Sequence, residues 1–289
     1  MPDAPAIFGP PQFRMPTVAR VRAHYTLLCA AAAKQFHAGS LAGHLLLIDG
    51  LADEGDALLI AASIAGAASL VLETGTEAVR HCVRNGIVDF AVTSLAEALR
   101  ILKNEVRKRQ PIAVLLERQP MSVLAEMVER GAQPDMLRWT APDPALKGYI
   151  DTMRARGAWP LPSPSAAPTN SPSPDSPTPD PPIPESAGHD LGDSQIDVCW
   201  RAGEGGTAVL RQLDLLAGQM LPADDLERQN WIARAPRYLS RALRLERCVA
   251  MTERERSAFL AGVEERTQQG ALAARVEISA GGQVRSFGT

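Results

Sequence analysis

The stretch HLLLIDGLADEGDALLIAASIAGAASLVLE (residues 44–73) decides the fold class of this chain. It opens with a short continuous apolar run at residues 44–48, which is typical of a strand buried on both faces. A turn with two glycines follows, then an apolar segment of helical length at residues 56–67 and a second apolar run at residues 69–73. The order strand, turn, helix, strand predicts a βαβ unit with two parallel strands.

The same alternation continues on both sides of this unit. Thr17 is positioned to cap a helix over residues 18–36, and Ser94 with Glu97 has the spacing of a capping box for a further helix. Between Val18 and Arg138 we expect helices at residues 18–36, 56–67, 76–85, 95–107 and 121–130, and strands at 44–48, 69–73, 88–92, 112–116 and 135–138. This pattern predicts an α/β fold with a doubly wound, Rossmann-like parallel sheet.

Prolines divide the chain. Nearly every second or third residue from Pro160 to Pro184 is proline, with small polar residues between, so this stretch has little to bury in a core. We therefore predict three parts: a Rossmann-like domain with an N-terminal helix at residues 1–158, a proline-rich linker at 159–187, and a smaller α/β piece at 188–289. In the last part we expect helices at 207–220, 225–245 (kinked or divided at Pro236) and 252–269, with strands at 248–251 and, finally, 274–279.

Composition narrows the class of partner. The formal net charge is -3 and the pI is about 6.0, so neither nucleic acid nor an acidic membrane is expected. The four cysteines are far apart, and we expect them to be reduced thiols packed as small hydrophobic groups. The N-terminus lacks the basic and apolar pattern of a secretory signal, and no apolar run is long enough to span a bilayer, so a cytoplasmic location is expected.

Several segments, in the same order, resemble the urocanase (urocanate hydratase) family. They are SLAGHLLLIDGL (residues 40–51), ASIAGAASLVLE (62–73), SLAEALR (94–100), VLAEMVERGAQPD (123–135) and DPALKGY (143–149), with weaker similarity over 207–284. The chain is thereby identified as a shortened and degenerate member, with a Rossmann domain at 1–158 and a C-terminal-like segment at 188–289. Urocanases use tightly held NAD as an electrophile that adds to urocanate, so the resemblance implies a dinucleotide site.

The resemblance places that site on the turn from Gly50 to Asp56. Where the family has a G-x-G-G-M-G-G run, this chain keeps Gly50 and Gly55 but has Ala52 between them. Asp53, Glu54 and Asp56 would set negative charge where a pyrophosphate should lie, at a cost on the order of 1–4 kcal/mol for each close like-charge pair. These acids also suit the positive end of the following helix without any ligand.

Two further residues match cofactor or site positions of the family. Glu73, at the end of the second strand, corresponds to the acid that contacts the NAD ribose, and Tyr149 corresponds to a site tyrosine. A strand-end acid facing solvent and a packed tyrosine explain them equally well. Ala78 and the pair Gln119-Pro120 replace an arginine and an Asn-Ala pair of the family. Gly50, Gly55, Glu73 and Tyr149 are therefore the predicted, vestigial cofactor residues.

The catalytic parts of the family are altered or absent. The loop Q-T-S-A-H-D is replaced by residues 139–143, without the histidine, and the segment with the catalytic cysteine is replaced by residues 278–285. The family's G-G-I-G-K and Y-G-N-N motifs have no counterpart, and we predict no catalytic residue. The five histidines lack metal-ligand spacing, and the Gly192-Asp-Ser194 sequence has no preceding strand, so neither a metal site nor a serine nucleophile is expected.

Three hypotheses follow. The first is a urocanase-like protein that lacks hydratase activity, has no cofactor, and acts as a binding or interaction module. The second is an NAD-dependent urocanate hydratase-type lyase of histidine degradation with a weakened cofactor site. The third is a structural partner that forms a homodimer or pairs with a urocanase.

Overall fold

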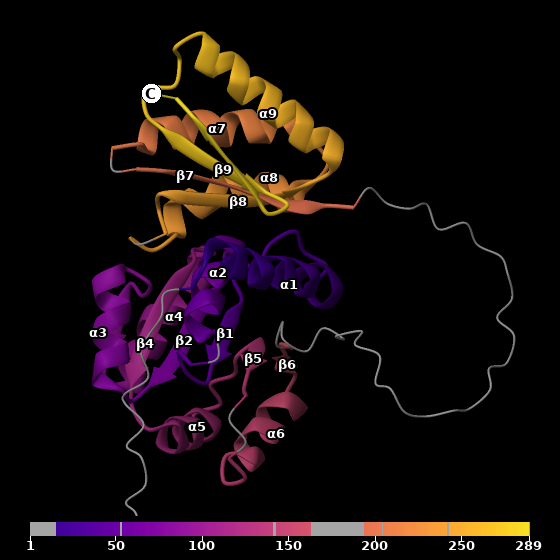
Figure 1. Cartoon of the computed structure of the whole chain (residues 1–289). Helices are drawn as coiled ribbons and strands as arrows, with labels where there is room; N and C mark the ends of the chain where they lie inside the picture. The colour runs from indigo at the N-terminus through magenta and orange to yellow at the C-terminus, as the bar shows by residue number, and fades with distance from the viewer. Residues whose placement is uncertain are drawn as a thin grey trace, which may run out of the picture. The chain divides into compact units, whose positions relative to one another are not determined.

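The computed structural model describes residues 16–52, 54–140, 143–162, 194–203, 205–241 and 243–288. These residues divide into two compact units (Figure 1). Those within Met1–Leu161 and Ala233–Arg244 form the first unit, and those within Pro162–Ile232 and Leu245–Thr289 form the second. Residues 163–193, which include most of the proline-rich stretch, lie outside the described residues.

The first unit is built on a six-stranded parallel sheet, which confirms the predicted α/β class. Its strand order is β3-β4-β2-β1-β5-β6. Its elements in chain order are α1 (Val18–Phe36), β1 (Leu45–Ile48), α2 (Gly55–Ala65), β2 (Ala68–Glu73), α3 (Thr76–Asn85), β3 (Phe90–Val92), α4 (Leu95–Lys108), β4 (Ile112–Glu117), α5 (Pro120–Glu129), β5 (Met136–Arg138), α6 (Lys147–Ala155) and β6 (Trp159–Pro160).

Both faces of this sheet are buried, which explains why its strands are continuous apolar runs. In β2, Leu70 and Leu72 belong to one core cluster with residues of α4, α5 and α6. Val71 lies between them and points to the opposite face, where it is equally buried and where α2 packs. The sheet is therefore covered by helices on both sides, as the doubly wound design requires.

Some of the predicted helix ends of the first unit are confirmed, and one predicted capping box is not. The hydroxyl of Thr17 accepts a hydrogen bond from the N–H of Arg20 at the start of α1, and α3 ends at Gly86, which has a positive φ of 64°. The capping box predicted at Ser94 and Glu97 is wrong, because the Ser94 side chain makes no capping hydrogen bond. Helix α4 begins there nonetheless, since its buried face packs on the sheet.

The prediction that residue 159 begins the linker is also wrong. Trp159 and Pro160 form β6, the last strand of the sheet, and pair with Met136 and Leu137 of β5. Leu161, next in sequence, is buried. Proline is tolerated there because β6 is an edge strand, with β5 as its one hydrogen-bonded neighbour among the strands that the structure describes.

The second unit contains a four-stranded antiparallel sheet of order β10-β9-β7-β8. The elements that follow β6 are β7 (Ile196–Ala202), α7 (Thr207–Met220), α8 (Leu226–Tyr238), β8 (Glu246–Met251), α9 (Glu253–Gln268), β9 (Val276–Ala280) and β10 (Gln283–Phe287). All of them lie in the second unit except the end of α8, which belongs to the first unit from Ala233 onward. The helix predicted at 225–245 ends at Tyr238, and the strand at 274–279 is not the last one, because the turn at Gly281-Gly282 returns the chain as β10. Thr252 caps α9 as predicted, in a capping box with Glu255.

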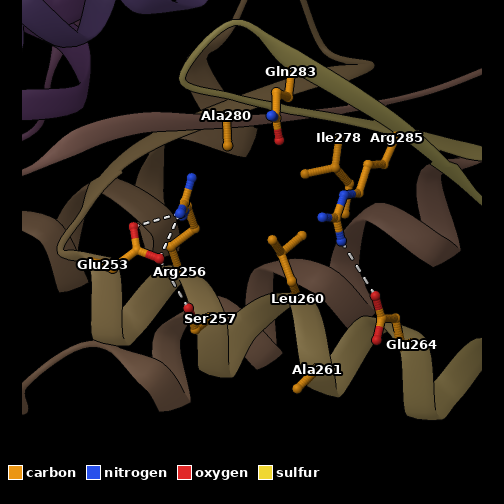
Figure 2. Close-up of a pocket in the computed structure, with 10 residues that line it drawn as sticks. All are labelled: Glu253, Arg256, Ser257, Leu260, Ala261, Glu264, Ile278, Ala280, Gln283 and Arg285. Atoms are coloured by element: carbon orange, nitrogen blue, oxygen red, sulfur yellow. Dashed lines mark hydrogen bonds and ion pairs between the residues drawn. The ribbon is translucent and has the colours of Figure 1, made fainter.

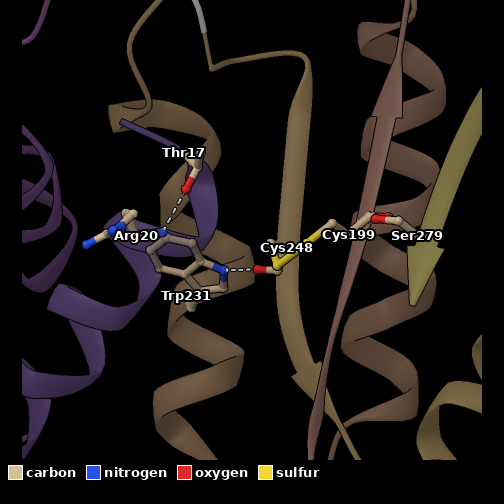
Figure 3. Close-up of a disulfide and its surroundings, with 6 residues drawn as sticks. All are labelled: Thr17, Arg20, Cys199, Trp231, Cys248 and Ser279. Atoms are coloured by element: carbon tan, nitrogen blue, oxygen red, sulfur yellow. Dashed lines mark hydrogen bonds between the residues drawn. A yellow bond between two sulfur atoms is a disulfide. The ribbon is translucent and has the colours of Figure 1, made fainter. Parts of the chain in front are cut away.

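A disulfide corrects the prediction that all four cysteines are reduced. Cys199 of β7 and Cys248 of β8 lie directly opposite each other in the antiparallel register and are joined by an S–S bond (Figure 3). The carbonyl of Cys248 also accepts a 2.6 Å hydrogen bond from the indole N–H of Trp231. Cys29 and Cys82 are not in a disulfide, and burial together with Asp56 and Glu73 raises the pKa of Cys82 to about 12.

Candidate functional site

The carboxyl ends of β1 and β5 mark the place where a ligand is expected. Strand β1 lies at the centre of the sheet, and the chain adds β2 on one side of it and β5 on the other. In open α/β sheets, ligands bind in the crevice outside the carboxyl ends of two such strands. Asp49 directly follows β1, and Arg138 is the final residue of β5.

Asp49 and Arg138 form a buried ion pair across this crevice. Arg138 Nη1 donates a hydrogen bond to Asp49 Oδ1 at 3.2 Å, and the two side chains are only 3% and 5% exposed. The other oxygen of Asp49 accepts hydrogen bonds from the backbone N–H and, at 2.8 Å, the hydroxyl of Thr140. The two strand ends are thus tied together by groups of the protein itself.

The turn after β1 packs against its own backbone. A Cβ added to Gly55 would overlap the carbonyl oxygen of Gly50 and lie 3.3 Å from Arg138 Nη1. The N–H of Gly55 donates to the carbonyl of Ala52 at 3.0 Å, and Arg138 donates to the same carbonyl at 3.4 Å. Gly55 is therefore required for the turn to close, independently of any phosphate.

The structure brings Glu73 to the same edge, next to Gly50. One oxygen of its carboxylate accepts the N–H groups of Thr74 and Gly75, both at 2.8 Å. The other accepts the N–H of Leu51 at 3.3 Å. Glu73 thus holds the turn after β1 to the turn after β2, and its oxygens are already used as acceptors.

The sequence suggested that the acids of the turn point at the position of a pyrophosphate. The structure shows that they do not all do so. Glu54 adopts a positive φ of 70° and its carboxylate turns to α1, where it pairs with Arg20 and lies 3.0 Å from His24 Nε2. Asp56 accepts the N–H of Ala57 at 2.7 Å, and burial raises the pKa of its carboxyl group. Asp53 lies outside the described residues.

His24 stands behind this turn as a buried, neutral base. Burial and the positive charges of Arg138 and Arg20 lower its pKa to about 4. The neutral ring can donate its Nε2–H to Glu54, which is an acceptor only. The cluster of Arg20, His24, Glu54, Asp49 and Arg138 is therefore a network of internal partners at the start of α2.

Other predicted site residues do not join this group. Tyr149 lies in the first turn of α6, where it is partly buried against the core cluster that includes Val123 and Met127 of α5. Ala78 is buried in α3, and Gln119 and Pro120 start α5. Sequence reasoning missed Asp49, Arg138, Thr140 and His24; a charged residue directly after or within an apolar strand was the available signal for the first two.

The second unit has a pocket of about 350 Å³ between α9 and the β9–β10 hairpin (Figure 2). Leu260 and Ile278 form its apolar part, and the arginines at its rim, Arg256 and Arg285, each face a glutamate of α9. Arg285 Nη1 lies 3.5 Å from Glu264. The pocket is thus a small apolar cavity, and the arginines at its edge are paired with glutamates.

The described part of the chain offers no group of three or more His, Cys, Asp or Glu side chains arranged to hold a metal ion. Within the same residues, every helix is too short or too polar to cross a lipid bilayer.

A parallel sheet covered on both faces, with a glycine-containing strand–helix turn at its switch point, defines a Rossmann-like α/β domain. The family described as the urocanase Rossmann-like domain matches residues 21–155. The match covers most of the first unit, which is thus similar to the Rossmann-like domain of urocanases.

Proposed function

We propose that this chain lacks urocanate hydratase activity and acts as a binding or interaction module. One observation carries the proposal: the groups that a dinucleotide would need at the carboxyl ends of β1 and β5 already have partners within the protein. The buried Asp49–Arg138 pair and the hydrogen bonds of Thr140 occupy the switch point itself.

A bound dinucleotide needs free backbone N–H groups at the start of the following helix. Here the N–H groups of Leu51, Gly55 and Ala57 donate to Glu73, Ala52 and Asp56, respectively. Binding would have to break such hydrogen bonds and bring pyrophosphate charge to Asp56 and Glu73. The residues present at this turn therefore do not fit NAD.

The residues that correspond to the catalytic loop of the family support the same proposal. No histidine occurs between Trp139 and Asp143. Asp143 accepts the N–H of Ala145 at 2.9 Å, and thereby serves the turn that leads into α6. The proposed interaction role thus retains the scaffold without an acid–base group on this loop.

The test is an assay of the purified full-length protein with urocanate, with and without added NAD. The ultraviolet absorption of urocanate should persist, whereas an active urocanase assayed in parallel should remove it. Loss of the band at a rate that scales with the concentration of this protein would refute the proposal.

The alternative is an NAD-dependent urocanate hydratase-type lyase with a weakened site. It is favoured by the proximity of Gly50, Gly55 and Glu73, which the turn places together at the strand ends. Denaturing the purified protein and analysing the supernatant by mass spectrometry separates the two. Stoichiometric NAD would favour the alternative, and a nucleotide-free supernatant would favour the interaction module.

A further inference from the structure

A groove of about 610 Å³ lies at the opposite edge of the first unit from β6, between α4, β3 and the start of β4. We define the α4–β3 groove by the residues that carry its chemistry: Phe90, Arg100, Ile101, Lys103, Arg107 and Ile112. Strand β3 is an edge strand, hydrogen-bonded to β4 alone among the described strands. Its outer side therefore presents backbone groups that an additional strand can use.

The floor of the groove is apolar. Phe90 is 49% exposed, which is unusual for a large hydrophobic residue, and it lines the groove together with Ile101 of α4. Ile112 at the start of β4 belongs to the core cluster beneath. The edge of the hydrophobic core is thus accessible here.

The wall of the groove is positively charged. Arg100, Lys103 and Arg107 follow one another at spacings of three and four along α4, so they lie on one face of the helix. Within the described chain, neither Arg100 nor Lys103 has a carboxylate partner, and Arg107 donates to the amide oxygen of Asn104 at 3.2 Å. The one acid of the groove, Glu105, is paired with Lys108 at 2.8 Å. This surplus of positive charge occurs in a chain whose net charge is -3.

We propose that the α4–β3 groove binds an extended, acidic peptide segment of a partner protein, with an apolar side chain placed against Phe90. This inference deepens the proposed function and rests on it. Side chains on one face of a strand recur every ~6.6–6.8 Å. Lys103 and Arg107 are separated by about 6 Å along the helix axis, so successive acids of the peptide can face successive cations.

The exposed apolar floor distinguishes this ligand from a generic polyanion. Nucleic acid would use the cations but would leave most of the apolar surface uncovered, and Phe90 provides a single stacking platform. An extended peptide covers the floor with one apolar side chain, pairs with the edge of β3, and neutralises the cations.

The experiment measures fluorescence anisotropy with a fluorescein-labelled nonapeptide, Glu and Leu in alternation, and the full-length protein. The double variant Arg100→Glu with Lys103→Glu should weaken binding at least tenfold. The matched control, Arg211→Glu with Arg254→Glu, makes the same change in net charge on exposed sites of the second unit and should change binding less than twofold. Phe90→Ser should weaken binding several-fold. The double variant Arg100→Ser with Lys103→Ser, which removes the two positive charges without reversing them, should also weaken binding.

Three results would overturn the inference: no binding of the nonapeptide by the wild-type protein, equal losses in the groove and control variants, or equal binding of a peptide in which serine replaces every leucine. The last two outcomes would indicate unspecific attraction of anions. The same would follow if an oligothymidylate displaced the labelled nonapeptide as well as the unlabelled nonapeptide does. None of these results affects the urocanate assay, so failure of this inference is distinguishable from failure of the proposed function.

Discussion

At the scale of single residues, Gly55 shows that a residue of a nucleotide-binding pattern can be required by the fold alone. Its hydrogen faces the carbonyl of Gly50, in a space where no methyl group fits. The turn would have to open to admit a side chain, and its contact with Arg138 would shift with it. A glycine at this position is therefore no sign of a phosphate ligand by itself.

Replacing Gly55 by alanine should destabilise the protein by roughly 1–3 kcal/mol, because the added methyl overlaps backbone that cannot easily move. The control is Gly148→Ala in α6, where an added Cβ meets nothing within 4 Å. That change should stabilise by about 0.5–1 kcal/mol, since alanine favours a helix. Urea denaturation measures both, and a Gly55→Ala variant as stable as Gly148→Ala would contradict the packing described for the turn.

His24 should make stability depend on pH. Its pKa is lowered from 6.5 to about 4 in the folded protein, so between these values the unfolded chain binds a proton that the folded protein does not. Stability is therefore complete above about pH 6.5 and falls as the pH approaches 4, by up to about 3 kcal/mol. In His24→Gln this part of the loss should disappear.

Urea denaturation at pH 7.5, 6.5 and 5.5 provides the comparison for His24, in a range where most carboxylates remain ionised. His37→Asn at the exposed end of α1 serves as the control, because asparagine tolerates the positive φ of 50° found there. The explanation fails when wild type and His24→Gln lose stability in parallel across this range.

At the scale of elements, the ion pair between Asp49 and Arg138 links β1 to β5. Removing one partner of a buried pair leaves a charge in an environment of low polarity, at a cost of roughly 3–5 kcal/mol. Arg138→Met should therefore destabilise by this amount, and combination with Asp49→Asn should recover a large part of it. Lys147→Met, which breaks the exposed pair with Asp151 on α6, should cost less than about 0.5 kcal/mol. Equal costs for the two single substitutions, measured in urea, would show that the pair does not join the strands.

The elements of the first unit were predictable because local pattern and tertiary environment agree there. Strands such as β1 and β2 are buried on both faces and are therefore apolar throughout, and α3 ends at the predicted Gly86. Strand β7 and the edge strands β6 and β10 were missed, since they are short, partly exposed or contain proline. Their place depends on a neighbouring strand distant in sequence, which no local pattern reveals.

The candidate site was less predictable than the fold. The glycines and Glu73 lie together as expected, but a sequence does not show which acceptor an N–H group finds. The orientation of Glu54 toward α1 depends on its positive φ and on Arg20, thirty-four residues earlier. The disulfide of Cys199 and Cys248 likewise results from the register of β7 on β8.

At the scale of the whole molecule, the family match and both candidate binding regions lie in the first unit. Residues 21–155 lie within the first unit, and this unit contains both the closed crevice at the strand ends and the α4–β3 groove. The part of the chain that is similar to a urocanase domain thus contains strand ends whose polar groups are paired within the protein, and a sheet edge with a positively charged groove. The similarity of residues 207–284 to the C-terminal portion of urocanases stays a prediction.

Because the polar groups at the carboxyl ends of β1 and β5 are paired within the protein, we can predict how NAD affects the stability of the full-length protein. A ligand that binds only the folded state stabilises it by an amount that grows with the ratio of its concentration to Kd, about 4 kcal/mol at a thousandfold ratio. For a site with micromolar affinity, 1 mM NAD would then raise the melting temperature by several degrees. We expect no such shift here, because the N–H groups of Leu51, Gly55 and Ala57 must first give up their internal acceptors. The acidic nonapeptide, added at the same concentration in differential scanning calorimetry, should raise the melting temperature of the wild-type protein but not that of Arg100→Glu with Lys103→Glu. A clear increase of the melting temperature with NAD would instead show that the turn can open to bind it, and would favour the NAD-dependent lyase over the interaction module.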